Sequence, residues 1–164
     1  MRSGLARLLP AIIVLVVATA AAEDAGRRML DEGQTHIPEG TRATYKHFPP
    51  TSGPHWPTWA AYGLHPEPLP PELWVHNLEH GGIVILYHCA QPCPELVRSL
   101  AEAYETFPRG KYGTVKLVVS PNARRRRPIA VLAWTWIDEM PAFDRARLLR
   151  FYQAHVDQGP EDVP

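Results

Sequence analysis

The chain has 164 residues, and its 17 lysines and arginines balance its 17 aspartates and glutamates, so the formal net charge is zero. This length suits one domain with a hydrophobic core, and a neutral chain lacks the surplus of cations that a general nucleic-acid binder needs. We therefore expect no nucleic-acid partner. Proline is abundant at 18 residues, against a common usage of roughly 5%. Its concentration between Pro38 and Pro71 predicts a long, proline-rich N-terminal loop of extended backbone.

Residues 1–22 have the three parts of a secretory signal peptide. Two arginines form the positive start, an apolar stretch follows, and small residues provide a cleavage site. The apolar stretch, residues 8–22, is interrupted by Pro10 and is shorter than the ~20 residues that span a bilayer. We expect cleavage and an extracytoplasmic protein, periplasmic or secreted. If the segment stays uncleaved, residues 8–22 tether the protein to a membrane.

The remainder of the chain divides into a short linker and one domain. Residues 23–35 are polar and have no clear period, which predicts a linker, and residues 36–164 form the expected single globular domain. The proline-rich loop carries Trp56 and Trp59. We expect it to lie on the domain and to bury these rings, because a solvated loop has no need of them. Long ordered loops of this kind are more often functional than ornamental.

From residue 82 onward the pattern predicts strand, helix, strand, strand, helix. The strands are expected at residues 82–87, 115–119 and 129–137, and the helices at 94–107 and 141–155. This order predicts an α+β (mixed α/β) fold, with two helices packed on a small sheet. We expect the first two strands to be parallel across the intervening helix. The last two strands are expected to form an antiparallel pair.

The segment just before the first strand, residues 71–80, allows two interpretations. Its proline and acid suit the first turn of a helix and Gly81 suits a helix stop, whereas residues 73–75 suit a strand. The difference matters because His76 and His80 lie four positions apart. On a helix both imidazoles share one face and can bind one ion. On a strand they lie about 13 Å apart, too far for a shared metal.

Two histidine clusters are expected to form one site. His76, Glu79 and His80 lie before the first strand, and His47 and His55 flank a proline-stiffened turn in the long loop. We predict that these five side chains bind a transition metal, with Glu79 as a ligand or a supporting acid. Imidazole and carboxylate suit zinc or copper, among other ions. The prolines favour the site because they reduce the entropy lost when the loop is ordered.

Other functions stay open at this point. The spacing His-x-x-Glu-His matches an inverted zinc-peptidase motif with Glu79 as general base, but Gly81 and Gly82 end the long helix that this motif needs. A metal-free hydrolase would use Ser52 or Cys89 as nucleophile, with a histidine as base. A non-catalytic interaction domain, in which the histidines only hydrogen-bond backbone groups, is the remaining alternative.

Cys89 and Cys93 are the only two cysteines, and export favours a disulfide between them. The bond would close a very small loop and add little chain-entropy stabilisation, so we expect it to fix the turn between the first strand and the following helix. Thiol–disulfide exchange and soft-metal ligation are the alternatives. The spacing has one residue more than the Cys-x-x-Cys redox motif.

The two central motifs resemble a family of exported bacterial proteins catalogued as domain of unknown function number 3105. The resemblance rests on the segment His47–His55, with Pro-Pro-Thr-Ser-Gly-Pro-His, and on Val75-His-Asn-Leu-Glu-His-Gly-Gly with the strand that follows. The closing segment that leads to Gly159-Pro160-Glu161 is also similar, so the resemblance covers roughly residues 36–164. It implies an exported or membrane-tethered protein with one compact domain, and it supplies no activity, ligand or catalytic residue.

Overall fold

The computed structural model describes residues 26–124 and 127–164, so the expected signal peptide and tether at residues 1–22 lie outside the described residues. Three helices and a six-stranded mixed sheet confirm the predicted α+β (mixed α/β) fold. The elements are β1 (Arg27–Arg28), β2 (Gly63–Leu64), α1 (Pro71–Glu79), β3 (Ile83–Tyr87), α2 (Pro94–Thr106), β4 (Leu117–Pro121), β5 (Ile129–Ala133), β6 (Trp136–Met140) and α3 (Arg145–His155). Within the described residues, every helix is too short or too polar to cross a bilayer.

The strand order across the sheet is β1-β6-β5-β3-β4-β2. β3 and β4 are parallel and α2 connects them, as predicted. The predicted antiparallel pairing of the last two strands was wrong. β5 pairs with β3, and the two neighbours of β4 are β3 and β2. The predicted single strand 129–137 was also wrong. Thr135 has a φ of 59°, and the chain turns there from β5 into the antiparallel strand β6.

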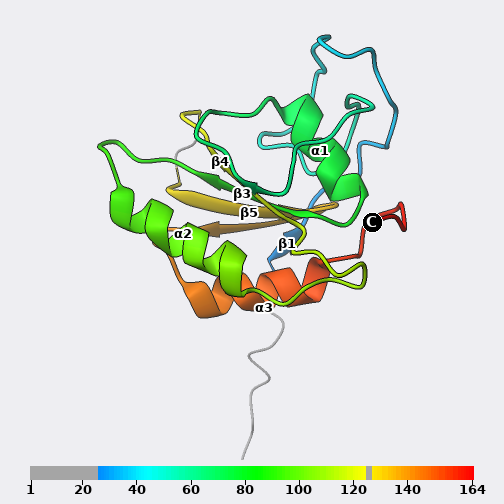
Figure 1. Cartoon of the computed structure of the whole chain (residues 1–164). Coiled ribbons are helices and arrows are strands. Elements are labelled where there is room, and N and C mark those ends of the chain that lie inside the picture. Colours follow the sequence, from blue (N-terminus) through cyan, green and yellow to red (C-terminus); the bar gives the residue numbers. More distant parts are fainter. Residues whose placement is uncertain (1–25, 125–126) are drawn as a thin grey trace, which may run out of the picture.

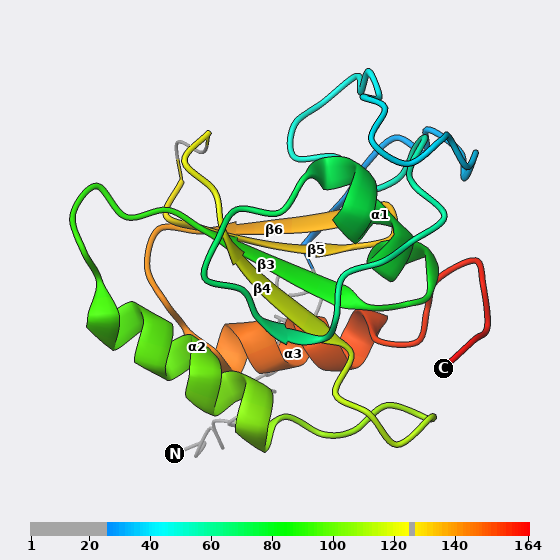
Figure 2. The same ribbon diagram turned by 45° about the horizontal axis from the view of Figure 1, so that its top comes forward.

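Helices cover both faces of the sheet and give three layers (Figures 1 and 2). In β3, Ile83 and Ile85 pack on the side of α2 and α3, whereas Val84 and Leu86 pack with Trp74 on the side of α1. This alternation follows from the two-residue period of a strand. Because both faces are buried, β3 is apolar throughout, as the continuous run in the sequence predicted.

α1 is a helix, and the strand interpretation of residues 73–75 was wrong. Proline occupies its first turn together with Glu72, where a fixed φ and a negative charge suit the helix start. The helix ends before Gly81, whose φ is 72°. A Cβ at this position would lie 2.7 Å from the Cα of Asp157, so glycine allows both the turn and the close approach of the C-terminal segment.

The long proline-rich loop lies against α1, and buried polar groups attach it there (Figure 2). The Asn77 side chain accepts a hydrogen bond from the backbone N–H of Ala60 at 2.9 Å and donates one to its carbonyl at 2.8 Å. Oε1 of Glu72 accepts a hydrogen bond from the backbone N–H of Ala43 at 2.9 Å. These contacts satisfy loop backbone groups that would otherwise be buried without partners, and they help to place His55 beside the helix.

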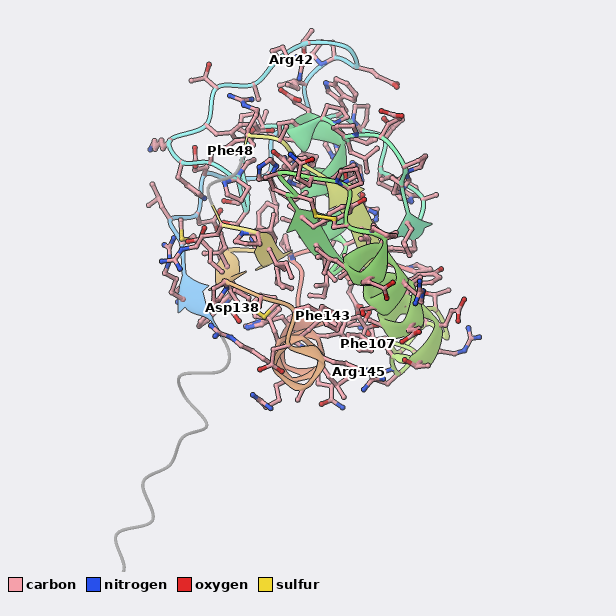
Figure 3. The ribbon with its side chains drawn as sticks, turned by 90° about the vertical axis from the view of Figure 1, so that its left-hand side faces the viewer. Arg42, Phe48, Phe107, Asp138, Phe143 and Arg145 are labelled. Carbon is pink, nitrogen blue, oxygen red and sulfur yellow. A yellow bond between two sulfur atoms is a disulfide. The ribbon has the colours of Figure 1, made fainter. Side chains whose placement is uncertain are left out.

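The N-terminal segment also contacts the domain. Residues 23–35 were expected to be a linker; of the part described, Arg27–Arg28 forms β1 at the edge beside β6. In a side view, Arg42 and Phe48 lie on the loop at one end, and Phe107 and Arg145 lie near α2 and α3 at the other (Figure 3). The loop and these two helices therefore occupy opposite sides of the sheet.

Candidate metal centre

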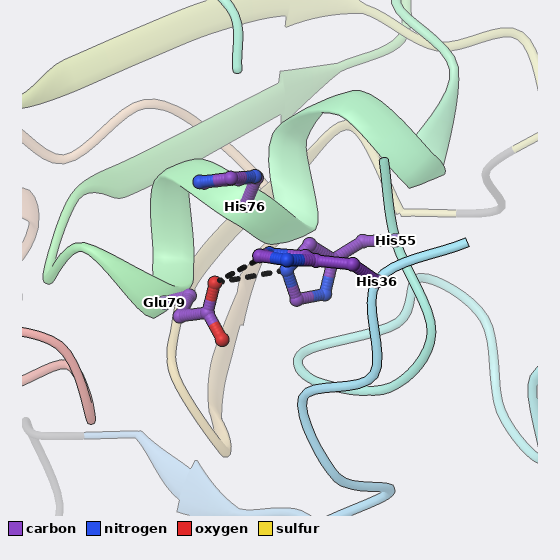
Figure 4. A group of neighbouring side chains, drawn as sticks. All are labelled: His36, His55, His76 and Glu79. Carbon is purple, nitrogen blue, oxygen red and sulfur yellow. Dashed lines mark hydrogen bonds and ion pairs between the residues drawn. The ribbon is translucent and has the colours of Figure 1, made fainter. Parts of the chain in front are cut away.

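α1 and the N-terminal part of the domain bring four polar side chains together (Figure 4). His76 and Glu79 are three positions apart on α1 and share one of its faces. His36 and His55 are held side by side by a parallel backbone bridge. The ligand atoms of these four residues lie within 4.8 Å of one another. All but His36 are buried, and the His36 side chain is 46% exposed, so the cluster is open to solvent on that side.

A second group adjoins the first and shares Glu79 with it. It consists of Glu79, His80 and Glu161, whose ligand atoms also lie within 4.8 Å of one another. Nε2 of His80 is 3.3 Å from Oε2 of Glu161 and 2.9 Å from Nε2 of His76. The backbone N–H of Glu161 donates to the carbonyl of Glu79 at 3.1 Å, which fixes the C-terminal segment against the end of α1.

Backbone carbonyls orient two of the imidazole rings. Nδ1 of His55 donates to the carbonyl of Gly53 at 2.8 Å, and Nδ1 of His76 donates to the carbonyl of Trp56 at 2.7 Å. Because a carbonyl oxygen only accepts, each Nδ1 carries the proton, and the Nε2 of each neutral ring then presents a lone pair. Metal-binding histidines are commonly held in this way, with one nitrogen bonded to a carbonyl and the other facing the metal.

The lone pair of His55 faces a carboxylate. Nε2 of His55 is 2.9 Å from Oε2 of Glu79, and Nε2 of His36 is 3.4 Å from the same oxygen. Two acceptors at this separation need a cation between or beside them, either a proton or a metal ion. Among the described residues, the ion-pair partners of Glu79 are histidines, with no lysine or arginine. Within the part of the chain that the structure describes, imidazoles therefore compensate the buried carboxylate of Glu79.

The environment favours the neutral form of His76 and His80. Burial lowers the pKa of His76, and the positive charge that His55 and His36 can carry lowers it further. Burial likewise lowers the pKa of His80, with His76 as the next cause. A neutral imidazole is the form that binds a metal, so these shifts reduce the competition from protons.

Aromatic rings form one wall of the site. The Trp59 ring centroid lies 5.2 Å from that of His76 and 5.0 Å from that of His80. Trp59 is 51% exposed, so the expected burial of this ring was wrong. The ring of His36 stacks on His76 with the centroids 5.1 Å apart. The histidines are therefore packed between an exposed indole and the helix, which limits the positions that their nitrogens can take.

The structure brings His55, His76 and Glu79 into one group and places His80 in the adjoining group. It places His47 elsewhere: Nδ1 of His47 is 2.9 Å from Oε1 of Glu32, and His47 belongs to neither group. The turn between His47 and His55 thus separates the two loop histidines.

Two members of the groups were missed by the sequence prediction. His36 lies before the proline-rich loop and reaches the site through its backbone bridge to His55. Glu161 lies beyond the last helix and reaches it through the C-terminal segment. Both contacts join residues far apart in sequence, so neither has a local period or spacing that would indicate it. The only available signal was the presence of a histidine and an acid at the two ends of the predicted domain.

The candidate nucleophiles lie in other surroundings. Ser52 is fully buried, and its Oγ accepts a hydrogen bond from the backbone N–H of Glu32 and donates one to the carbonyl of Leu30. Cys89 and Cys93 form the predicted disulfide, with their Cα atoms 6.2 Å apart. It follows the C-terminal end of β3, whereas the histidines lie before the start of that strand. The disulfide leaves no free thiol among the described residues.

Fold and site together define an α+β domain with a histidine- and glutamate-rich cluster that can hold a metal ion. The chain belongs to the family described as "Protein of unknown function (DUF3105)", whose match covers residues 36–164. The matched region begins at His36 and contains Glu161, so it includes every member of both groups. No curated protein and no solved structure matches the chain.

Proposed function

We propose that this protein is an exported domain that binds a transition metal ion, zinc or copper, through His36, His55, His76 and Glu79. The observation that carries the proposal is the pair of acceptors formed by His55 and Glu79, 2.9 Å apart and buried. The carbonyl of Gly53 holds the proton of His55 on Nδ1, so a cation is needed at the Nε2 side. A metal ion bound to Nε2 and to the carboxylate supplies that cation.

The donor set supports zinc or copper(II). Three imidazole nitrogens and one carboxylate oxygen match the ligands and the coordination number of zinc, with bonds of about 2.0–2.2 Å. Imidazole also suits copper(II), whereas copper(I) prefers the thiolate of cysteine or the thioether of methionine. Both cysteines are in a disulfide at the other end of β3, which disfavours copper(I) at this site.

The proposed location is outside the cytoplasm. Residues 1–22 have the pattern of a signal peptide, and a disulfide such as Cys89–Cys93 persists in oxidising compartments. The domain would work there either as a free protein after cleavage or as a protein tethered through residues 8–22. We propose no catalytic activity, since Ser52 and Cys89 are both engaged in structural bonds.

Elemental analysis of untagged protein tests the proposal. The protein is exposed to zinc or copper(II), dialysed, and its bound metal is measured beside that of a His55→Gln/His76→Gln variant and a His65→Gln control. His65 bonds the carbonyl of Ala61 and belongs to neither group. We expect the double variant to retain less metal than the wild type and the control, with circular dichroism showing that each protein is folded.

A wild type without retained metal would overturn the proposal, as would equal retention by the double variant. The histidines would then serve as structural hydrogen-bonding groups in a non-catalytic interaction domain. Glutamine keeps a polar side chain of similar reach, so the double variant removes the imidazole ligands with little change in volume.

A further inference from the structure

The two groups of potential ligands are too extended to serve one ion. Glu79 is the only residue common to both, and His80 and Glu161 do not join the group of His36, His55 and His76 within 4.8 Å. A four-coordinate ion with bonds of about 2 Å needs its ligand atoms closer together than that limit. The ligands beyond the first four are therefore left for a second ion.

His80 has an unmet hydrogen-bonding group. Its Nδ1 is buried without a partner among the described residues, in contrast to His55 and His76, whose Nδ1 atoms bond carbonyls. Nε2 of His76 is an acceptor, so Nε2 of His80, only 2.9 Å away, must donate to it in the neutral state. Nδ1 of His80 then offers an unpartnered lone pair, which a metal ion or a donor from outside the chain can satisfy.

The C-terminal segment is fastened in the position that delivers Glu161. Nζ of Lys116 donates to the carbonyl of Val163 at 2.6 Å and to the carbonyl of His80 at 2.9 Å. The Tyr112 hydroxyl donates to Oδ1 of Asp162 at 2.7 Å. A Cβ on Gly159 would collide with the backbone of Glu79, so the absence of a side chain lets the segment pass next to α1. The contacts of Gly159, Asp162 and Val163 thus hold the Glu161 carboxylate at the site from both sides in the sequence.

Charge favours two ions as well. The six side chains comprise two carboxylates and four imidazoles, so one divalent cation would be bound by Glu79 and leave Glu161 without a partner other than His80. A carboxylate shared between two divalent ions lowers their mutual repulsion, and two-metal sites place the ions about 3.5–4 Å apart. Glu79 lies where such a shared carboxylate is needed.

We infer that this protein holds two divalent metal ions, with Glu79 bridging an ion bound by His36, His55 and His76 and an ion bound by His80 and Glu161. The inference rests on the proposed function and adds a second ion site to it. It also gives the C-terminal segment a role, since the second site is incomplete without Glu161.

Zinc stoichiometry tests the inference. We expect about two zinc ions per chain in the wild type, about one in Glu161→Gln, and about two in a Glu105→Gln control. Glu105 is an exposed acid on α2, so its substitution removes the same charge far from the site. Glu161 is 43% exposed at its side chain, and we expect Glu161→Gln to fold as the wild type does.

The zinc content of the wild type and of Glu161→Gln distinguishes a failure of the second site from a failure of metal binding as such. One ion in the wild type, or two in Glu161→Gln, would overturn the second site and leave the proposed metal binding intact. No ion in the wild type would overturn both. As a second readout, copper(II) paramagnetic resonance should show two coupled ions in the loaded wild type and one isolated ion in Glu161→Gln. Isolated signals from both ions in the wild type would overturn the bridge.

Discussion

Nε2 of His55 lies 2.9 Å from Oε2 of Glu79, and the two side chains are 0% and 1% exposed. The pair joins the proline-rich loop to the last turn of α1. Without a metal, a proton must occupy the space between the two acceptors, and its removal leaves a buried carboxylate beside a lone pair. The position of the loop is therefore coupled to the cation at this site.

A ligand substitution should weaken metal binding far more than a substitution of His47. We expect His76→Gln to lower zinc affinity by more than about 100-fold. Loss of a residue that only hydrogen-bonds a metal ligand costs ~10–100-fold, and loss of a ligand itself should cost more. His47→Gln should leave the affinity unchanged, because His47 bonds Glu32 outside both groups. Competition with a chelating dye measures both constants, and equal losses in the two variants would contradict the assignment.

Metal should stabilise the fold. An ion that binds only the folded state raises the free energy of unfolding by about 2.7 kcal/mol at a free concentration of 100 times its Kd. Urea denaturation with buffered zinc and with a chelator should show this difference in the wild type. The difference should be smaller in His55→Gln, whereas a shift of equal size in that variant would place the stabilising ion elsewhere.

The metal-free protein should lose stability in mild acid. Burial lowers the pKa of His76 and His80 in the folded state. In the unfolded chain, a histidine has a pKa of about 6.5. As the pH falls below about 6.5, these histidines take up protons in the unfolded chain but not in the folded protein. The free energy of unfolding therefore decreases as the pH falls from this value to the lower pKa of the folded state. Urea denaturation of chelator-treated protein at several pH values measures this slope. His80→Gln should flatten it, and an unchanged slope would contradict the prediction.

Trp59 should report on the bound metal. Its ring is close to His76 and His80, so copper(II) in the site should quench its fluorescence. Trp59→Phe should remove most of the copper-dependent quenching and keep the copper content. If the variant is quenched as strongly as the wild type, the copper lies near another tryptophan.

Much of the fold could be predicted from local sequence patterns. The predictions that were wrong concern contacts between distant segments and a turn without a clear sequence signal. The apolar run of β3 and the amphipathic period of α2 each reflect their own burial, and both elements occur within a residue or two of their predicted limits. The turn at Thr135 lacks the glycine or asparagine that marks most positive-φ positions. The pairing of β5 with β3 depends on the whole sheet, which no single segment encodes.

In the site as well, local contacts could be predicted from the sequence and contacts between distant segments could not. His76 and His80 are related by helical spacing, so their proximity could be predicted once α1 was taken as a helix. His36 reaches His55 through a bridge between distant segments, and Glu161 arrives by way of the C-terminal segment. Within the loop, His47 and His55 look equivalent in sequence, but the partner of His47 is Glu32 and that of His55 is Glu79.

Lys116 should be critical for stability. Its side chain is 0% exposed and its Nζ lies 3.0 Å from Oδ1 of Asp157. Lys116→Met should cost about 3–5 kcal/mol of unfolding free energy, because it leaves a largely buried carboxylate unpaired. Lys116→Met/Asp157→Asn should recover part of the loss in chemical denaturation. A change within about 0.5 kcal/mol, as at an ordinary surface position, would contradict this role.

Anomalous diffraction from crystals grown with zinc, recorded on both sides of the metal absorption edge, locates the ion directly. We expect a peak about 2.0–2.2 Å from Nε2 of His55, Nε2 of His76 and a carboxylate oxygen of Glu79. A zinc-loaded crystal with no peak among these atoms, or with its ordered zinc only at surface histidines such as His65, would contradict it.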